Sequence, residues 1–171
     1  GPYVTVGGKN LAYQDSATIS EDENAKPFRS LSARGSIEYV VVPNYGAEED
    51  YAGLDLTGKI ALVQRGGSMY YEQKERNAAN AGAIGMLVYN NVPGMLYMSI
   101  TDWKIPCAFI SQAAGEYMKQ QQTKTLSVAS ADALVESPTY GMADFSSLGA
   151  TPELTLKPEI TAPGAGIYAA V

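Results

Sequence analysis

The pattern that decides the fold lies in residues 58–91, which read GKIALVQRGGSMYYEQKERNAANAGAIGMLVYNN. Lys59–Gln64 and Ala83–Tyr89 are short apolar runs, and this pattern predicts two buried strands. Between them, Ser68 is a plausible N-cap for a helix that continues to about Ala81. A strand, a helix and a strand at this spacing predict a parallel βαβ unit.

Further strands and one more helix are predicted on both sides of this unit. Proline, glycine and polar clusters separate them along the chain. The predicted strands are Tyr3–Val6, Ile37–Val42, Ile105–Ile110 and Thr125–Ala129, and the predicted helix is Gln112–Gln121. Two short helices among several strands indicate a mixed α/β domain.

The composition is that of a folded domain and excludes several classes of partner. Of 171 residues, 46% are hydrophobic and 18% are charged, which is typical of globular proteins. The net charge is −6 and the 12 Lys and Arg residues form no basic stripe, so no nucleic-acid partner is expected. No apolar run approaches the ~20 residues of a membrane span. The acidic runs Glu21–Glu23 and Glu48–Asp50 lack the loop spacing of a calcium site and are interpreted as solvated loops.

The absence of histidine argues against an independent hydrolase. Ser-His-Asp and Cys-His catalysis need an imidazole base, and zinc hydrolases usually need histidine ligands. A Ser-Lys pair or a carboxylate pair remains open, although no motif indicates either. Cys107 is the single cysteine and lies in an apolar strand, so we expect a small core residue and no disulfide within the chain.

The turn between the first strand and the helix of the βαβ unit consists of Arg65, Gly66, Gly67 and Ser68. Free N–H groups at the start of a helix could hold a carboxylate or a phosphate. The Lys-Ser/Thr ending of a phosphate-binding loop is missing, so we interpret these residues as a structural turn.

Tyrosine and other large side chains gather just after the second strand. Tyrosine gives a large contact area at low entropic cost, so an exposed subset could contact a polypeptide. Methionine and tryptophan in this region could form an adaptable apolar lip or could pack in the core. The candidates for substrate contact are Tyr89, Asn90, Asn91, Met95, Tyr97 and Trp103.

Three blocks in this order resemble the protease-associated (PA) domain family. They are GKIALVQRGG at 58–67, NAANAGAIGMLVYNN at 77–91 and IPCAFIS at 105–111. The resemblance implies a PA-type swivelling β/β/α domain, with a mixed, barrel-like sheet, a βαβ unit and short flanking helices. Ser68 stands where many eukaryotic members carry a cysteine, so the corresponding disulfide is not expected.

The two ends of the chain resemble parts of a subtilisin-like catalytic domain. FSSLG at 145–149 and LKPEITAPG at 156–164 are similar to the subtilase segment before the nucleophile, and YVTVGG at 3–8 is similar to the strand that precedes a PA insert. The resemblance implies three parts: 1–34, an N-terminal flank from the catalytic domain plus connector; 35–136, the PA domain; and 137–171, a C-terminal flank from the catalytic domain.

The resemblance also implies a function for the chain. It would be the non-catalytic PA domain of an extracellular or cell-wall-associated, bacterial subtilisin-like serine endopeptidase, and it would gate or dock protein substrates near the active site. The alternative is a structural or dimerisation insert without substrate contact. The triad Asp, His and Ser and the oxyanion Asn are absent, so we expect no catalytic residue, metal site or cofactor. Calcium in the intact protease stays open. The expected partners are protein or peptide substrates and the catalytic domain in cis.

Overall fold

The fold is known from a computed structural model, which describes residues 1–16, 26–95 and 104–130. All of them belong to one compact unit, Gly1–Glu136. Tyr97 and Trp103 lie outside the described residues, and so do the segments 145–149 and 156–164.

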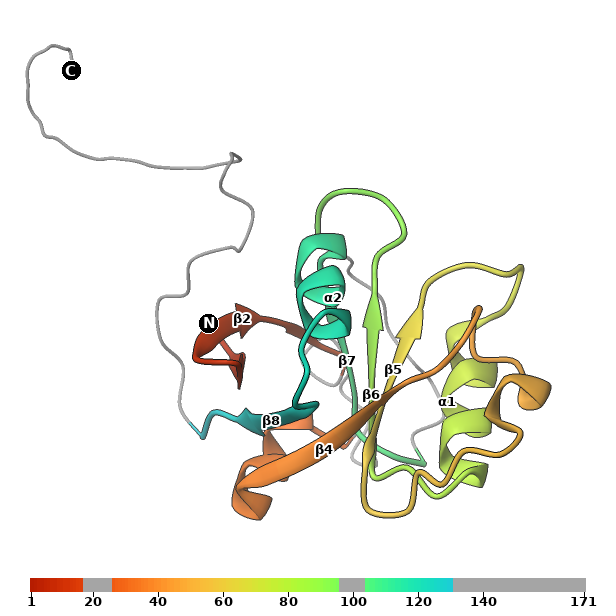
Figure 1. The fold of residues 1–171 in the computed structure, drawn as a ribbon, viewed down its shortest axis with the longest axis horizontal. Helices are drawn as coiled ribbons and strands as arrows, with labels where there is room; N and C mark the ends of the chain where they lie inside the picture. The colour runs from red at the N-terminus through yellow and green to blue at the C-terminus, as the bar shows by residue number, and fades with distance from the viewer. Residues whose placement is uncertain (17–25, 96–103, 131–171) are drawn as a thin grey trace, which may run out of the picture. The chain divides into compact units, whose positions relative to one another are not determined.

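One sheet of eight strands carries the fold (Figure 1). The first and last strands of the sheet, β2 and β3, follow each other directly in the chain, so the sheet curls toward a barrel. This agrees with the barrel-like mixed fold predicted from the sequence. Across the sheet the order is β2 (Lys9–Ala12), β1 (Tyr3–Val6), β8 (Thr125–Val128), β4 (Ser36–Val41), β5 (Ile60–Gln64), β6 (Gly85–Tyr89), β7 (Cys107–Ile110) and β3 (Gln14–Asp15).

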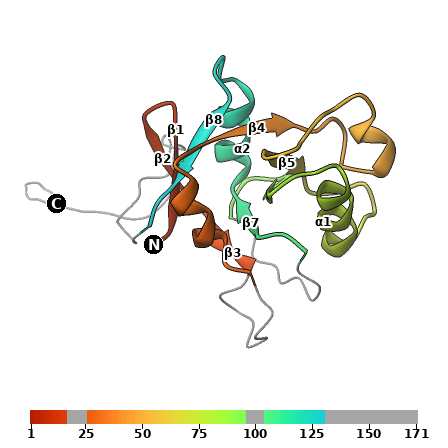
Figure 2. The same ribbon diagram turned by 90° about the horizontal axis from the view of Figure 1, so that it is seen from below.

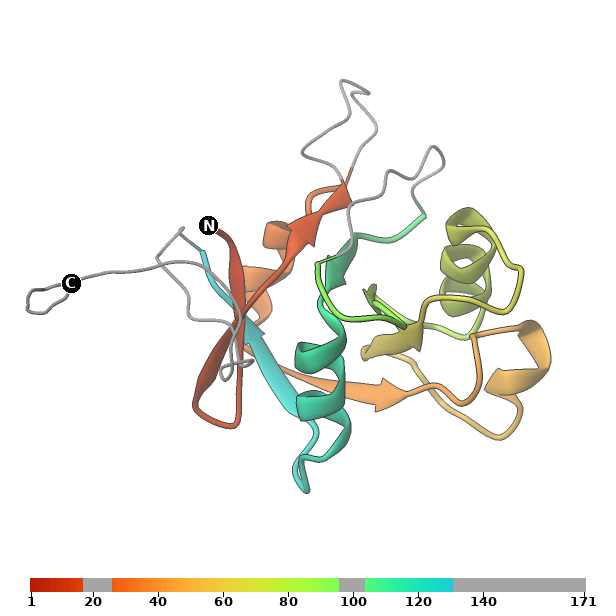
Figure 3. The same ribbon diagram turned by 90° about the horizontal axis from the view of Figure 1, so that it is seen from above.

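The sheet has a parallel half and an antiparallel half. β4, β5, β6 and β7 pair in parallel, and Ile60 stands opposite Gly85 in the register of the central pair. β1, β2 and β8 pair antiparallel, and β8 joins the first half of β4. Figures 2 and 3 show β1 and β2 on the side of the sheet that is away from α1 (Tyr71–Asn80). The predicted βαβ unit is confirmed, because α1 connects β5 to β6.

The central strands are buried on both faces, which explains their continuous apolar runs. Figure 1 shows β5 and β6 between α1 and α2 (Gln112–Lys119). Leu62 and Leu87 belong to one core cluster with Met118 of α2, whereas Val63 and Val88 belong to a second cluster with Ala78 of α1. Cys107 is fully buried in the second cluster, and this desolvation raises the pKa of its thiol. The prediction of a small core residue at this position is confirmed.

The helix of the βαβ unit begins later than the sequence predicts. Gly66, Gly67 and Ser68 have φ angles of 125°, 73° and 56°. An N-cap residue needs extended backbone, so Ser68 cannot be the cap, and Tyr70 precedes the helix instead. A serine does cap α2, where the Ser111 hydroxyl accepts a hydrogen bond from the Ala114 amide at 3.1 Å.

The segment expected to be an N-terminal flank, 1–34, takes part in the same sheet. It contributes β1, β2, β3 and the short 3-10 helix η2 (Phe28–Arg34). Val4, Leu11 and Phe28 are fully buried in the core cluster that includes Met118. The folded unit therefore includes residues before the expected start at Gly35. The origin of this flank in a catalytic domain stays a prediction.

Candidate interaction surface

The ends of the parallel strands bring three loops to one edge of the sheet. Since β4, β5 and β6 run in the same direction, their carboxyl ends lie together, and such an edge is where α/β sheets commonly form binding sites. In Figure 1 the arrowheads of β5 and β6 point to the same side, with their loops beyond them. We call residues 43–47, 65–70 and 90–95 the carboxyl-edge surface.

Each of these loops exposes one large hydrophobic side chain. Tyr45 is 39% exposed, Tyr70 is 81% exposed and Val92 is 49% exposed. No other large hydrophobic side chain among the described residues is exposed to this degree. Single exposed hydrophobic residues are ordinary, but their gathering on adjoining loops is typical of an interaction surface.

Two glycines allow the first two loops to pack closely. The Tyr45 ring lies against Gly66 and Gly67, and a Cβ atom at Gly67 would stand 2.7 Å from the Cβ of Tyr45. Both glycines also have positive φ, which other residues rarely adopt. The third loop reaches the same place, because a Cβ at Gly66 would lie 3.4 Å from the Asn91 side-chain nitrogen. The turn interpretation of Arg65 to Ser68 agrees with this geometry.

A buried lysine of α1 lies beneath the first two loops. The Lys74 Nζ donates hydrogen bonds to the carbonyl oxygens of Tyr45 at 2.5 Å, Gln64 at 2.9 Å and Gly66 at 3.0 Å. The Lys74 side chain is 0% exposed, and its Nζ lies 5.6 Å from the centre of the Tyr45 ring. Desolvation lowers the pKa of Lys74 to about 8, although Asp50 acts in the opposite direction. The amine is therefore an ammonium at neutral pH.

The loop that carries Tyr45 has further hydrogen bonds. The Asp50 carboxylate accepts from the Asn44 side chain at 2.8 Å and from the Ala47 amide at 2.9 Å. These hydrogen bonds, with that of Asn44 the largest cause, lower the pKa of Asp50. Asn77 of α1 donates to the Gly46 carbonyl at 3.1 Å. The acidic run at Glu48–Asp50, predicted to be a solvated loop, lies in the short 3-10 helix η3 (Glu48–Tyr51), and its last residue holds the preceding loop in place.

The third loop is held from both sides. Arg65 donates to the Asn90 side-chain oxygen at 3.2 Å, and the Asn90 nitrogen donates to the Gly94 carbonyl at 3.2 Å. Gln112, at the first turn of α2, donates to the Asn91 carbonyl at 3.2 Å. The residues that follow β6 are therefore connected both to the turn after β5 and to α2.

The four predicted contact residues that the structure describes divide into two groups. Tyr89 and Asn90 are buried, at 3% and 4% exposure, so they are not surface contacts in this structure, contrary to the prediction. For Tyr89 the reason is the close approach of α2, since a Cβ at Gly115 would overlap its side chain. Asn91 is exposed and Met95 is half-buried, so both can contribute to the carboxyl-edge surface.

The sequence analysis missed Lys74, Tyr45 and Tyr70 as members of this region. Lys74 interrupts the apolar stripe of its helix and therefore resembles an ordinary surface lysine. The only available signal for Tyr45 was its position in a loop that follows a predicted strand, and Tyr70 fell within the first turn of the helix predicted from Ser68. The position of Tyr45 becomes informative only when the parallel order of the strands is known.

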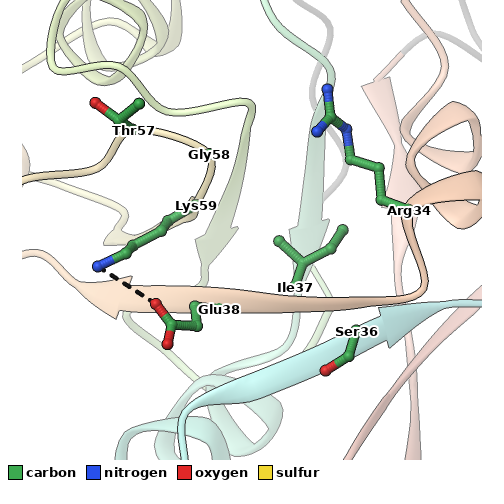
Figure 4. Close-up of a pocket in the computed structure, with 7 residues that line it drawn as sticks. All are labelled: Arg34, Ser36, Ile37, Glu38, Thr57, Gly58 and Lys59. Carbon is green, nitrogen blue, oxygen red and sulfur yellow. Dashed lines mark ion pairs between the residues drawn. The ribbon is translucent and has the colours of Figure 1, made fainter.

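The opposite edge of the parallel strands carries an open, mostly polar pocket of about 300 Å³ (Figure 4). Glu38 and Lys59 form an ion pair at 3.3 Å. Figure 4 shows the Arg34 guanidinium directed away from this pair, so the two cations do not converge on one ligand position. The pocket is lined by Arg34, Ser36, Ile37, Glu38, Thr57, Gly58 and Lys59.

Within residues 1–16, 26–95 and 104–130, no three His, Cys, Asp or Glu side chains come together to hold a metal ion. No helix in this part of the chain has both the length and the apolar character needed to cross a bilayer.

Comparison with protein families and curated proteins gives clear relatives. The model of the PA domain family matches residues 33–118. The minor extracellular protease Vpr of Bacillus subtilis is 38% identical over 138 residues, which is 77% of this chain and 16% of the relative. The C5a peptidase of Streptococcus pyogenes is 35% identical over 130 residues, which is 75% of this chain and 11% of the relative. The chain thus spans less than a fifth of the length of these relatives.

Comparison with solved structures supports the fold. A zinc aminopeptidase from Bacillus subtilis, BSAP, matches with a TM-score of 0.60 and 23% identity over 75% of this chain and 29% of its own. A psychrophilic subtilisin-like protease from Pseudoalteromonas sp. AS-11 matches with a TM-score of 0.51 and 18% identity over 75% of this chain and 32% of its own. At these identities the likeness concerns the fold alone.

Proposed function

Because this chain belongs to the PA domain family, we propose that it is the non-catalytic docking domain of a secreted, bacterial subtilisin-like serine endopeptidase. Its carboxyl-edge surface holds protein substrates near the active site of the catalytic domain. The observation that carries the proposal is the gathering of Tyr45, Tyr70 and Val92 on three loops that are tied together. The names of the relatives support it, since one is an extracellular protease and another is a peptidase.

The strand pairing supports a position as an insert in a larger protein. Val4 of β1 stands opposite Val128 of β8, and the Ala129 amide donates to the Tyr3 carbonyl at 3.0 Å. The chain therefore enters and leaves the sheet at neighbouring points. A domain with neighbouring ends can be inserted into one loop of another domain without distorting it.

Two nucleophilic side chains of the described region are already used in the fold, which supports a non-catalytic role. Lys74 donates all of its hydrogen bonds to backbone carbonyls, and Cys107 is fully buried. The sequence contains no histidine. We propose no cofactor for the domain. Calcium in the intact protease stays a separate question.

The test uses the full-length protease and removes the three exposed side chains together. Tyr45→Ser, Tyr70→Ser and Val92→Ser in one variant should lower kcat/KM for an unfolded protein substrate by about tenfold, because a few apolar anchors carry most of a contact's energy. The kcat/KM for a short fluorogenic peptide should stay within about twofold, since such a peptide is too small to reach the docking surface.

The matched control lies at the opposite edge of the sheet. Arg34→Ser and Thr57→Ser change the polar pocket and should leave both substrates unaffected. Equal losses of kcat/KM on the protein and the peptide would show a general defect of the protease. Thermal unfolding of each variant identifies such a defect independently. Equal losses on the two substrates, or an unchanged kcat/KM for the protein substrate in the triple variant, would refute the docking function.

The alternative is a structural or dimerisation insert, because the same exposed side chains suit a contact with another folded domain. In that case the triple variant should change the sedimentation coefficient of the protease and leave the ratio of protein to peptide hydrolysis constant. Docking predicts the reverse on both measurements.

A further inference from the structure

We propose that Lys74 is the positioning residue of the carboxyl-edge surface: its ammonium group acts as an internal cation that ties the loops after β4 and β5 together and so holds the docking surface in shape. The inference rests on the proposed docking function, and it deepens that function by naming the group that makes the surface rigid. Lys74 itself does not touch a substrate, because it is fully buried.

The three acceptors belong to separate parts of the chain. The Tyr45 carbonyl lies in the loop after β4, the Gln64 carbonyl ends β5, and the Gly66 carbonyl lies in the turn before α1. An ammonium group has three N–H donors, so three carbonyls match its capacity. Without these donors, three part-buried carbonyl groups would lose a hydrogen-bond partner, which is costly.

The hydrogen-bond geometry of the site matches the three donors of an ammonium group better than the two donors of a neutral amine. A neutral amine has two N–H donors, so at least one of the three carbonyls would be left without a donor from Lys74. The Tyr45 ring, 5.6 Å from the Nζ, adds an attraction that only a cation can use. Lys74 therefore contributes hydrogen-bond donors and a positive charge to the site, and not only the volume of an aliphatic side chain.

The effect of Lys74 extends to the third loop through the turn after β5. Arg65 is next to the Gly66 acceptor and donates to Asn90 at 3.2 Å. The Asn91 side chain lies beside Gly66. A release of the turn should thus loosen residues 90–95 as well.

The experiment uses the 171-residue chain and compares Lys74→Met with Arg76→Met. Arg76 is exposed on the same helix and serves as the matched control. The first measurement is amide hydrogen exchange at residues 44–47 and 64–68. The second is binding to reduced, carboxymethylated α-lactalbumin, an unfolded protein probe. Lys74→Met should speed exchange in the loops and weaken binding, each by about tenfold or more, while β5 and β6 stay protected. Arg76→Met should change neither.

A rescue experiment tests whether the site needs the positive charge of Lys74 or only the volume of its side chain. Lys74→Ala removes three carbons and the amine, which is the size of n-propylammonium. This ion, added at neutral pH, should restore slow exchange in the loops and binding to the probe, whereas n-propanol of the same length should not. Where Lys74→Met fails to fold, the same pair of additives is tested on the melting temperature of Lys74→Ala.

The outcomes distinguish this inference from the docking function. Unchanged loop exchange in Lys74→Met, equal rescue by the amine and the alcohol, or no rescue at all would overturn the positioning role. A wild-type chain that does not bind the probe would count against docking, while opening of the loops in Lys74→Met would still support the cation. Loss of both loop order and binding, restored only by n-propylammonium, supports the two together.

Discussion

The two edges of the parallel half of the sheet differ in whether their lysine is buried or exposed to solvent. At the carboxyl edge, the buried Lys74 donates hydrogen bonds to three backbone carbonyl groups. The loops above it expose apolar side chains. At the opposite edge, which we call the amino edge because β4 and β5 begin there, Lys59 and Glu38 pair in an open pocket, with side chains that are 33% and 64% exposed. A buried cation can fix backbone geometry, whereas a solvated pair is screened and mobile. This difference is the reason why we place the proposed docking function at the carboxyl edge.

The largest expected effect concerns the barrel on which both edges depend. Burial, as the largest cause, raises the pKa of Tyr13 and that of Tyr39 to about 12. In the unfolded chain tyrosine titrates near 10, so the stability from these two groups is present below pH 10 and is lost as the pH rises to 12. We expect a loss of roughly 5 kcal/mol in the free energy of unfolding, from about 1.4 kcal/mol per pKa unit and group.

Urea unfolding between pH 7 and pH 12 measures this loss. Lys74 has the opposite effect at lower pH, because its pKa of about 8 in the folded chain is below the 10.5 of an unfolded lysine. The contribution of Lys74 to the free energy of unfolding should therefore increase as the pH rises from about 8 to 10.5. Tyr39→Phe should remove only a part of the alkaline decrease, because burial also raises the pKa of Tyr13 and of Tyr51. A decrease of the same size in Tyr39→Phe would contradict the assignment.

The second prediction compares the two lysines directly. Lys74→Ala should lower the free energy of unfolding by about 3 kcal/mol or more, because it leaves a cavity and removes the donors of three carbonyls. Lys59→Ala should cost less than about 0.5 kcal/mol, since its ion pair is solvated. Urea denaturation of both variants at neutral pH provides the values. Similar costs at the two positions would remove the contrast between the edges.

The third prediction uses one glycine from each edge. Gly67 and Gly58 have nearly the same φ, 73° and 75°. A Cβ at Gly67 would collide with Tyr45, whereas nothing lies within 4 Å of a Cβ at Gly58. Gly58→Ala should therefore cost about 1 kcal/mol from backbone strain alone, and Gly67→Ala about 2 kcal/mol more from the clash. Thermal unfolding of the pair isolates the steric part, and equal costs would mean that Tyr45 moves away freely.

The sequence predicted the parallel half of this fold well, for a physical reason. Strands that are buried on both faces have unbroken apolar runs, and glycines in the turns separate these runs. Lys59–Gln64 and Ala83–Tyr89 could therefore be predicted as strands from the sequence alone. The resemblance to the PA domain family is confirmed by the family match. β2 and β3 escaped prediction because KNLA and QD have no strand signature, and they become strands only by pairing with β1 and β7.

The candidate site was less accessible to sequence reasoning. Its lysine belongs to the middle of α1, and its acceptors come from backbone carbonyls, which have no sequence signature. Tyr89 was an expected contact because it is a tyrosine at the end of a predicted strand, yet the absence of a side chain at Gly115 lets α2 cover it. Burial of this kind depends on the approach of two elements and not on either sequence alone.

The smallest effect is expected for the ion pair at the amino edge. Glu38→Gln removes the charge that faces Lys59 at 3.3 Å but keeps the shape of the side chain. Exposed pairs of this kind contribute at most about 1 kcal/mol, and salt screens them, so the stability difference between Glu38→Gln and the wild type should be small and should vanish in 1 M salt. Urea unfolding at low and high salt checks this. A cost above about 1 kcal/mol that persists in high salt would mean that the amino edge, like the carboxyl edge, holds a structural charge, and the contrast on which the docking proposal depends would then fail.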